Sequence, residues 1–191
     1  MAEIEVVIEG SGKHCHVTRE ALDALYGQGY ELEVKNWLSQ PGQYVSNQKV
    51  TVVGPKNRMD VSIIGPCRKH TQVELSYTDA VSIGLRPPVR ESGHLENSPG
   101  CTIIGPKGQV TTENGVIVAK RHIHLTPEDA ERFGIHDQQI VKVRCEGPRA
   151  LIFDEVVCRV SPEYATFMHI DYDELNAAAI RSKDPIGKIL L

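Results

Sequence analysis

The chain has 191 residues, which suits one ordinary domain or two small joined halves and is too short for a (β/α)₈ barrel of about 250 residues. Hydrophobic residues make up 40% and charged residues 24%, which excludes a disordered chain, and aromatic residues are only 5%, which leaves few rings to stack on nucleobases. The formal net charge of -4 argues against a general nucleic-acid binder.

Short runs rich in β-branched residues predict strands along most of the chain. They are residues 3–9, 50–53, 61–64, 72–77, 102–104, 115–125, 140–145, 151–160 and 166–170. Gly-Pro pairs punctuate these runs, and proline ends strands because it cannot donate to a sheet ladder. Many short strands at this spacing predict a mainly β protein built as a small barrel or sandwich.

Three brief helices are expected between the strands. Residues 18–26 form the first, ended by Gly27. The second begins after Thr126 as N-cap, has Pro127 at its first position and stops at Gly134. The third spans residues 171–180, and the Pro-rich segment 87–100 is expected to be an ordered loop.

Neither export nor membrane insertion is expected. Residues 1–10 have the pattern of an acidic strand rather than a signal peptide, and no apolar run approaches the ~20 residues needed to cross a bilayer. The five cysteines form no CxxC pair, which favours reduced thiols in a cytosolic protein over a disulfide scaffold.

An internal repeat links the two halves of the chain. His14-Cys15-His16 is echoed by His122-Ile123-His124, and a short predicted helix ending at glycine follows each. Residues 71–77 align with residues 166–172 without a gap, which sets Glu74 opposite His169. We therefore expect a duplicated unit of strand, HxH motif, capped helix and later strands.

The HxH motif has a direct chemical meaning on a strand. Side chains alternate between faces, so both histidines of a pair project together, about 6–7 Å apart, and can converge on one cation. The repeat nominates a third ligand for each pair. The two predicted sets leave a coordination position open, as catalytic zinc sites do: His14, His16 and Glu74, and His122, His124 and His169.

A cupin-like metal site is an alternative interpretation of the histidine pairs. His14-x-His16 is followed at HxHx₃E spacing by Glu20, and His124 is followed by Glu128, but both glutamates lie at a helix start, where the helix dipole explains an acidic residue.

Arginine and lysine near the motifs predict an anion site, because guanidinium groups match phosphate oxygens. The candidates are Arg68, which lies just before the strand that carries Glu74, and Arg121, Lys13 and Arg90.

Several motifs together resemble those of the phosphate propanoyltransferases, the phosphotransacylases of propanediol utilisation. They are AKRHIHLTPEDAERFG around His122, PPVRESG at 87–93, SQPGQ at 39–43, RKHTQVELS at 68–76 and MHID at 168–171. The first motif departs from the family's usual SNRHVHL, with Gly12 and Lys13 before His14.

The resemblance implies acyl-CoA and phosphate as substrates, two bound metal ions, usually zinc, and a homodimer. It implies two small β-barrels capped by short helices, formed by residues 13–119 and by residues 1–12 with 120–191. The ligand sets above and a phosphate-binding Arg68 carry over. No microcompartment-targeting extension precedes the first strand, so a cytoplasmic enzyme is expected. A cupin-like metal enzyme and a non-catalytic, microcompartment-associated metal-binding module stay open as alternatives.

Overall fold

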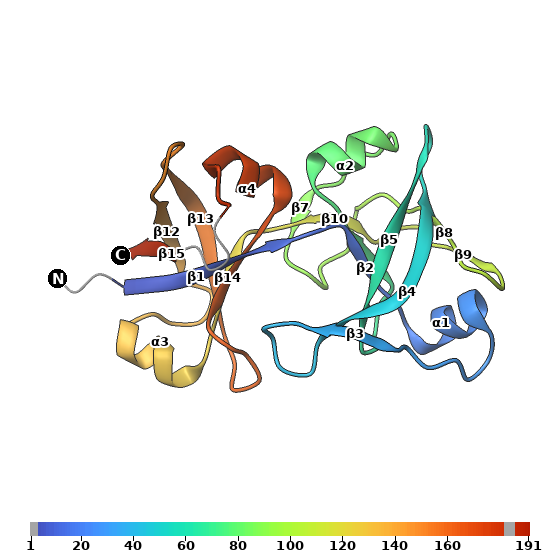
Figure 1. The fold of residues 1–191 in the computed structure, drawn as a ribbon, viewed down its shortest axis with the longest axis horizontal. Coiled ribbons are helices and arrows are strands. Elements are labelled where there is room, and N and C mark those ends of the chain that lie inside the picture. Colours follow the sequence, from blue (N-terminus) through green and yellow to red (C-terminus); the bar gives the residue numbers. More distant parts are fainter. Residues whose placement is uncertain (1–3, 182–185) are drawn as a thin grey trace. The chain divides into compact units, whose positions relative to one another are not determined.

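The computed structural model describes residues 4–181 and 186–191, which divide into two compact units (Figure 1). The terminal unit holds the described chain up to Ser11, Ser39–Pro41 and the described residues from Lys120 onward; the central unit holds Gly12–Leu38 and Gly42–Ala119. The predicted domains, 1–12 with 120–191 and 13–119, stay a prediction, and their residues 1–3 and 182–185 lie outside the described part. Residue 3 of the predicted first strand also lies outside the described part.

The terminal unit is a closed barrel with an aliphatic core. Its strand order is β1 (Ile4–Ser11), β14 (Phe167–Asp171), β11 (His122–Leu125), β13 (Leu151–Val160), β12 (Ile140–Cys145) and β15 (Ile186–Leu190). Burial alternates residue by residue along β12, as expected where one face of a strand lines a core. Two short helices, α3 (Pro127–Phe133) and α4 (Tyr172–Ala178), accompany the barrel.

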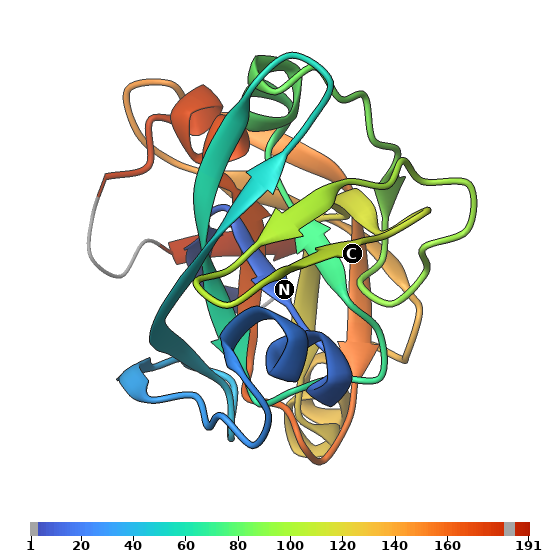
Figure 2. The ribbon, with the colours of Figure 1, turned by 90° about the vertical axis from the view of Figure 1, so that its right-hand side faces the viewer.

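The central unit is a curled, open sheet. Its order is β7 (Val89–Arg90), β10 (Val116–Ala119), β6 (Gln72–Glu74), β2 (His14–His16), β5 (Arg58–Gly65), β4 (Tyr44–Val53), β8 (Thr102–Ile104) and β9 (Gln109–Thr111), with β3 (Val34–Trp37) paired to β4. Figure 2 shows β4 and β5 as a long, twisted hairpin. Helix α1 (Arg19–Tyr26) buries Leu22 and Leu25 in this unit's core, and α2 (Tyr77–Ser82) follows β6.

The mainly β class with short helices is therefore confirmed, as one closed barrel and one curled half-barrel sheet. The repeat is visible in the hydrogen bonds. The Thr18 amide donates to Thr71 Oγ1 at 3.2 Å in the central unit, and the Thr126 amide donates to Thr166 Oγ1 at 3.3 Å in the terminal unit. Both Thr18 and Thr126 also cap the helix that follows them. Within residues 4–181 and 186–191 no helix has the length and hydropathy of a membrane span.

Two predicted strands were wrong in extent. The run 115–125 is broken at Lys120 and Arg121, and its halves β10 and β11 belong to different units. The run 72–77 ends as a strand at Glu74, because the Ser76 side chain accepts a hydrogen bond from the Asp79 amide and so starts α2. Both runs are rich in residues with high β propensity, so the sequence did not indicate where these strands end.

Several strands were missed, namely β3, β7, β9, β15 and the first half of β4. All four residues of β3 are exposed, so its sequence has no buried face and no apolar alternation. Strand β7 is two residues long and lies inside the segment predicted as a loop. Such strands form because a neighbouring strand offers hydrogen bonds, a property that local sequence does not carry.

Candidate metal centres and an adjoining pocket

The first ligand group joins strands β2 and β6 of the central unit. Alternation places His14 and His16 on one face of β2, and the antiparallel register sets Glu74 opposite His14. Each residue offers a ligand atom within 4.8 Å of the others. Glu74 Oε2 lies 3.5 Å from His14 Nε2, and Glu74 Oε1 lies 3.9 Å from His16 Nε2. All three residues are buried.

Backbone carbonyls orient both imidazoles of this group. His14 Nδ1 donates to the carbonyl oxygen of Gly12 at 2.7 Å, and His16 Nδ1 donates to that of Ile64 at 3.2 Å. A carbonyl only accepts, so these bonds place the proton on Nδ1 and leave the Nε2 lone pair facing Glu74. Metal-binding histidines show the same arrangement.

The protonation states in this group also suit a cation. Burial, together with the neighbouring His14, lowers the pKa of His16 to about 3, so its imidazole is neutral near pH 7. Burial alone would raise the pKa of Glu74, but His14, His16, Ser92 and Arg68 outweigh it and lower that pKa to about 2. The group therefore offers imidazole nitrogens and a carboxylate, which are the donors that zinc accepts.

A hydrogen-bonded network also holds the Glu74 carboxylate. Glu74 Oε1 accepts from Gln72 Nε2 at 2.6 Å and from Ser92 Oγ at 3.0 Å. Ser92 Oγ in turn accepts from Arg68 Nη1 at 3.3 Å. The predicted phosphate-binding arginine is thus connected to the first ligand group through a single serine.

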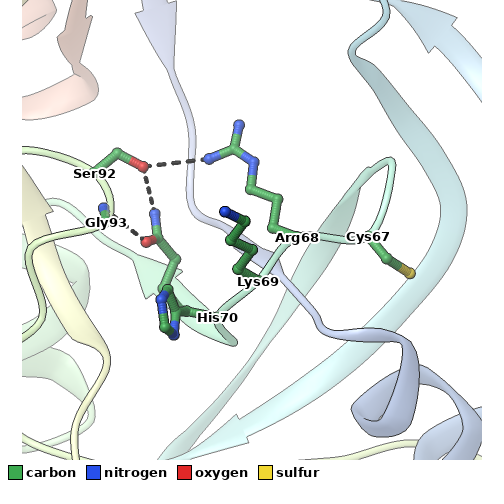
Figure 3. A pocket seen from close by; sticks show the side chains of 7 residues that line it. Cys67, Arg68, Lys69, His70, Ser92 and Gly93 are labelled. Carbon is green, nitrogen blue, oxygen red and sulfur yellow. Dashed lines mark hydrogen bonds between the residues drawn. The ribbon is translucent and has the colours of Figure 1, made fainter.

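Arg68 lines a pocket of about 410 Å³ within the central unit (Figure 3). The pocket is lined by Cys67, Arg68, Lys69, His70, Gln72, Ser92 and Gly93. In the close view, Arg68 and Ser92 face each other and the Cys67 sulfur points away from them. Arg68 Nη2 also donates to Gln43 Oε1 at 2.9 Å, which fixes the guanidinium plane. The pocket combines two cationic side chains with small polar groups, a chemistry that suits an anion.

The second ligand group has the same construction in the terminal unit. His122 and His124 share a face of β11, and His169 on β14 lies opposite His122 in the antiparallel register. Their ligand atoms lie within 4.8 Å of one another. His122 Nδ1 donates to the carbonyl oxygen of Lys120 at 2.8 Å, which leaves its Nε2 for a ligand. Three imidazoles also form a donor set that zinc accepts.

The other predicted basic residues contact acidic side chains or the backbone. Arg121 Nε is 2.8 Å from Glu174 Oε1, and Lys13 Nζ is 3.3 Å from Asp79 Oδ1. Arg90 Nη1 donates to the carbonyl oxygen of Val89 at 3.1 Å. Their part in substrate binding stays a prediction, whereas Arg68 is the one that hydrogen bonds connect to a ligand group.

The two glutamates of the cupin-like alternative lie in helices. Glu20 is in the first turn of α1 and Glu128 is in the first turn of α3, and both are exposed. Neither belongs to a ligand group among the described residues. Their position at helix N-termini agrees with the helix-dipole explanation.

Sequence reasoning gave no role to the residues that surround the ligands. Gln72 and Ser92 contact Glu74, and Gln40 contacts His169. These three residues lie in RKHTQVELS, PPVRESG and SQPGQ, the motifs that carry the family resemblance. For Gln40 and Ser92, their place in glycine- and proline-containing segments was the available signal, because loops often carry binding residues.

Comparison with known proteins identifies the family of this chain. The family model for phosphate propanoyltransferase matches residues 7–181. A phosphate propanoyltransferase of Listeria monocytogenes is 50% identical over 182 residues, which are 95% of this chain and 85% of that protein. One of Thermotoga maritima is 51% identical over 181 residues, which are 94% of this chain and 86% of that protein. One of Enterococcus faecalis is 51% identical over 184 residues, which are 96% of this chain and 87% of that protein. The chain belongs to the phosphate propanoyltransferase family of phosphate acyltransferase enzymes.

Proposed function

We propose that the chain transfers a short acyl group, propanoyl or acetyl, between coenzyme A and inorganic phosphate, with one divalent metal ion, zinc, in each ligand group. The observation that supports the proposal best is the pairing of a buried His₂Glu group with the arginine-lined pocket, joined through Ser92, in a member of this family. A homodimer and a cytoplasmic location, which the resemblance implies, stay predictions.

In the proposed reaction a phosphate oxygen attacks the thioester carbonyl carbon, the carbon–sulfur bond breaks, and coenzyme A leaves as a thiolate that takes up a proton. A divalent ion in these groups supplies Lewis-acid polarisation and a soft partner for thiolate. Arg68 binds the phosphate and aims it, because its planar guanidinium pairs with two oxygens at once. Gln43 and Ser92 hold that guanidinium in place before substrate arrives.

Direct transfer needs no protein nucleophile. Cys15 is the thiol closest in sequence to the ligands, but its side chain is fully buried on the opposite face of β2, among the core residues. Burial also raises the pKa of the Cys15 thiol far above its ordinary value, which keeps it protonated and unreactive. Its role is to fill the core.

A Cys15→Ser variant is therefore expected to keep its turnover within about threefold and its metal content, while its free energy of unfolding falls by about 1–2 kcal/mol because a hydroxyl is buried. Thiol release, metal analysis and thermal unfolding measure these quantities. Cys101→Ser, at another buried cysteine of the same core and outside the pocket, is the matched control. A folded Cys15→Ser protein that retained both metals and lost all turnover would overturn direct transfer.

The function itself is tested by phosphate-dependent release of free thiol from propanoyl-CoA and acetyl-CoA. Treatment with a chelator is expected to abolish the activity, and zinc, cobalt or manganese is expected to restore it. Full activity in a sample verified as metal-free contradicts the metal-assisted scheme. A sample with bound metal and no thiol release with any acyl-CoA contradicts the assignment as an enzyme on these substrates and favours the non-catalytic alternative.

A further inference from the structure

The second ligand group has an acidic neighbour. Strand β1 runs parallel to β14 in the terminal barrel, and the register sets Glu9 beside His169. Glu9 Oε2 lies 3.7 Å from His169 Nδ1, within ion-pair range. When a histidine binds a metal through Nε2, its Nδ1 atom can contact a second partner. Glu9 therefore occupies the place of a carboxylate partner to a metal-binding histidine.

A short loop segment contacts both this carboxylate and the His169 ring. Residues Ser39–Pro41 lie between β3 and β4 in the chain but belong to the terminal unit. Ser39 Oγ donates to Glu9 Oε2 at 2.5 Å. The Gln40 amide bonds the backbone of Ala165 in both directions, donating at 2.9 Å and accepting at 3.3 Å, and its Nε2 lies 3.4 Å from His169 Nε2. Gln40 is buried, so this arrangement is built into the fold.

The equivalent position of the first ligand group is apolar. Strand β10 runs parallel to β6 as β1 does to β14, and the residue beside Glu74 is Ile117, which is fully buried. A carboxylate there would face the Glu74 carboxylate in a dry environment and would be costly. Where the third ligand is the carboxylate of Glu74, the neighbouring strand supplies isoleucine; where it is the imidazole of His169, the neighbouring strand supplies glutamate. Each group thus has one carboxylate.

We propose that Glu9, held by Ser39, is a positioning residue of the second metal centre. It sets a carboxylate 3.7 Å from His169 Nδ1, which favours the ring orientation that turns Nε2 toward the metal, and it adds a carboxylate to a ligand group made of three histidines. The inference rests on the proposed function for the existence of the metal, and it adds a residue outside the ligand sets. Loss of outer partners of this kind typically weakens metal binding by about 10–100-fold.

The test measures metal affinity rather than turnover. Wild type, Glu9→Gln and Ser39→Ala are titrated with cobalt(II) and zinc(II) against a chromophoric chelator, with visible spectra of the cobalt forms. Glu9→Gln keeps the size and the acceptor oxygen but removes the charge. It is expected to weaken one of two metal sites by about tenfold and to alter the spectrum of that site alone. Ser39→Ala is expected to do the same to a smaller extent. Glu5→Gln, at an exposed position of β1, is the matched control.

The outcomes separate this inference from the proposed function. If wild type binds two metal ions per chain and Glu9→Gln binds both as tightly as Glu5→Gln does, with an unchanged cobalt spectrum, the role of Glu9 is wrong and the metal centres stand. Equal weakening at both sites also contradicts it, because the effect is then not local to His169. If wild type binds no metal, the metal-assisted function fails, and the inference fails with it.

Discussion

Replacing Glu74 by glutamine is expected to remove the metal ion of the first ligand group and to lower kcat by about 1000-fold, equivalent to about 4 kcal/mol of transition-state stabilisation. Glutamine keeps the volume and still accepts from Ser92, so the fold is preserved. The neutral amide is a poor zinc ligand beside His14 and His16. Metal analysis should fall from about two ions per chain to about one, because the second group is built from other strands.

Glu96→Gln, an exposed change of the same kind in the central unit, is the control and should leave metal content and rate unchanged. Circular dichroism and thermal unfolding verify that the Glu74→Gln protein is folded. Retention of both metals and of more than a tenth of the wild-type kcat would show that Glu74 is an ordinary buried carboxylate, stabilised only by Gln72 and Ser92.

Replacing Arg68 by alanine is expected to raise the KM for phosphate by about 100-fold, because two charge-assisted hydrogen bonds are together equivalent to about 2.7 kcal/mol or more. The KM for acyl-CoA should change much less. Arg68→Lys is expected to recover only part of the loss, since an ammonium group keeps the charge but not the planar pair of donors. Initial-rate kinetics with each substrate varied in turn provide the measurement.

The connection of Arg68 to Glu74 through Ser92 requires a metal analysis alongside the kinetics. If Arg68→Ala keeps its metal ions and loses phosphate affinity, Arg68 acts on the substrate. If it loses the first metal instead, its role is to support Glu74. Arg58→Ala, at an exposed arginine at the start of β5, is the matched control and should leave both KM values unchanged.

The local parts of this protein follow from its sequence. Alternation along a strand is set by adjacent peptide units, so each HxH motif already predicted that its two histidines share a face. Helix caps are equally local. Thr126 accepts a hydrogen bond from Asp129, only three residues away, and Gly134 takes the left-handed conformation with a φ of 67° that ends α3.

The third residue of each ligand group needed more than local pattern. Glu74 lies far along the chain from His14. The internal repeat, which aligns it with His169, and the family resemblance pointed to it. The structure brings each of these residues opposite the first histidine of its pair through the sheet register. Duplication made this part predictable, because two copies of one unit repeat the same register.

The surroundings of the ligands were decided by the tertiary structure alone. Ser92 reaches Glu74 from a segment predicted as a loop, and Gln40 bonds Ala165 across 125 residues of chain. The break of 115–125 into strands of two units likewise depends on which sheet each half joins. The sequence by itself determined strand faces, helix caps and the paired histidines, since neighbouring residues set them. Contacts between distant segments depend on chain closure and strand pairing, and no local pattern records these.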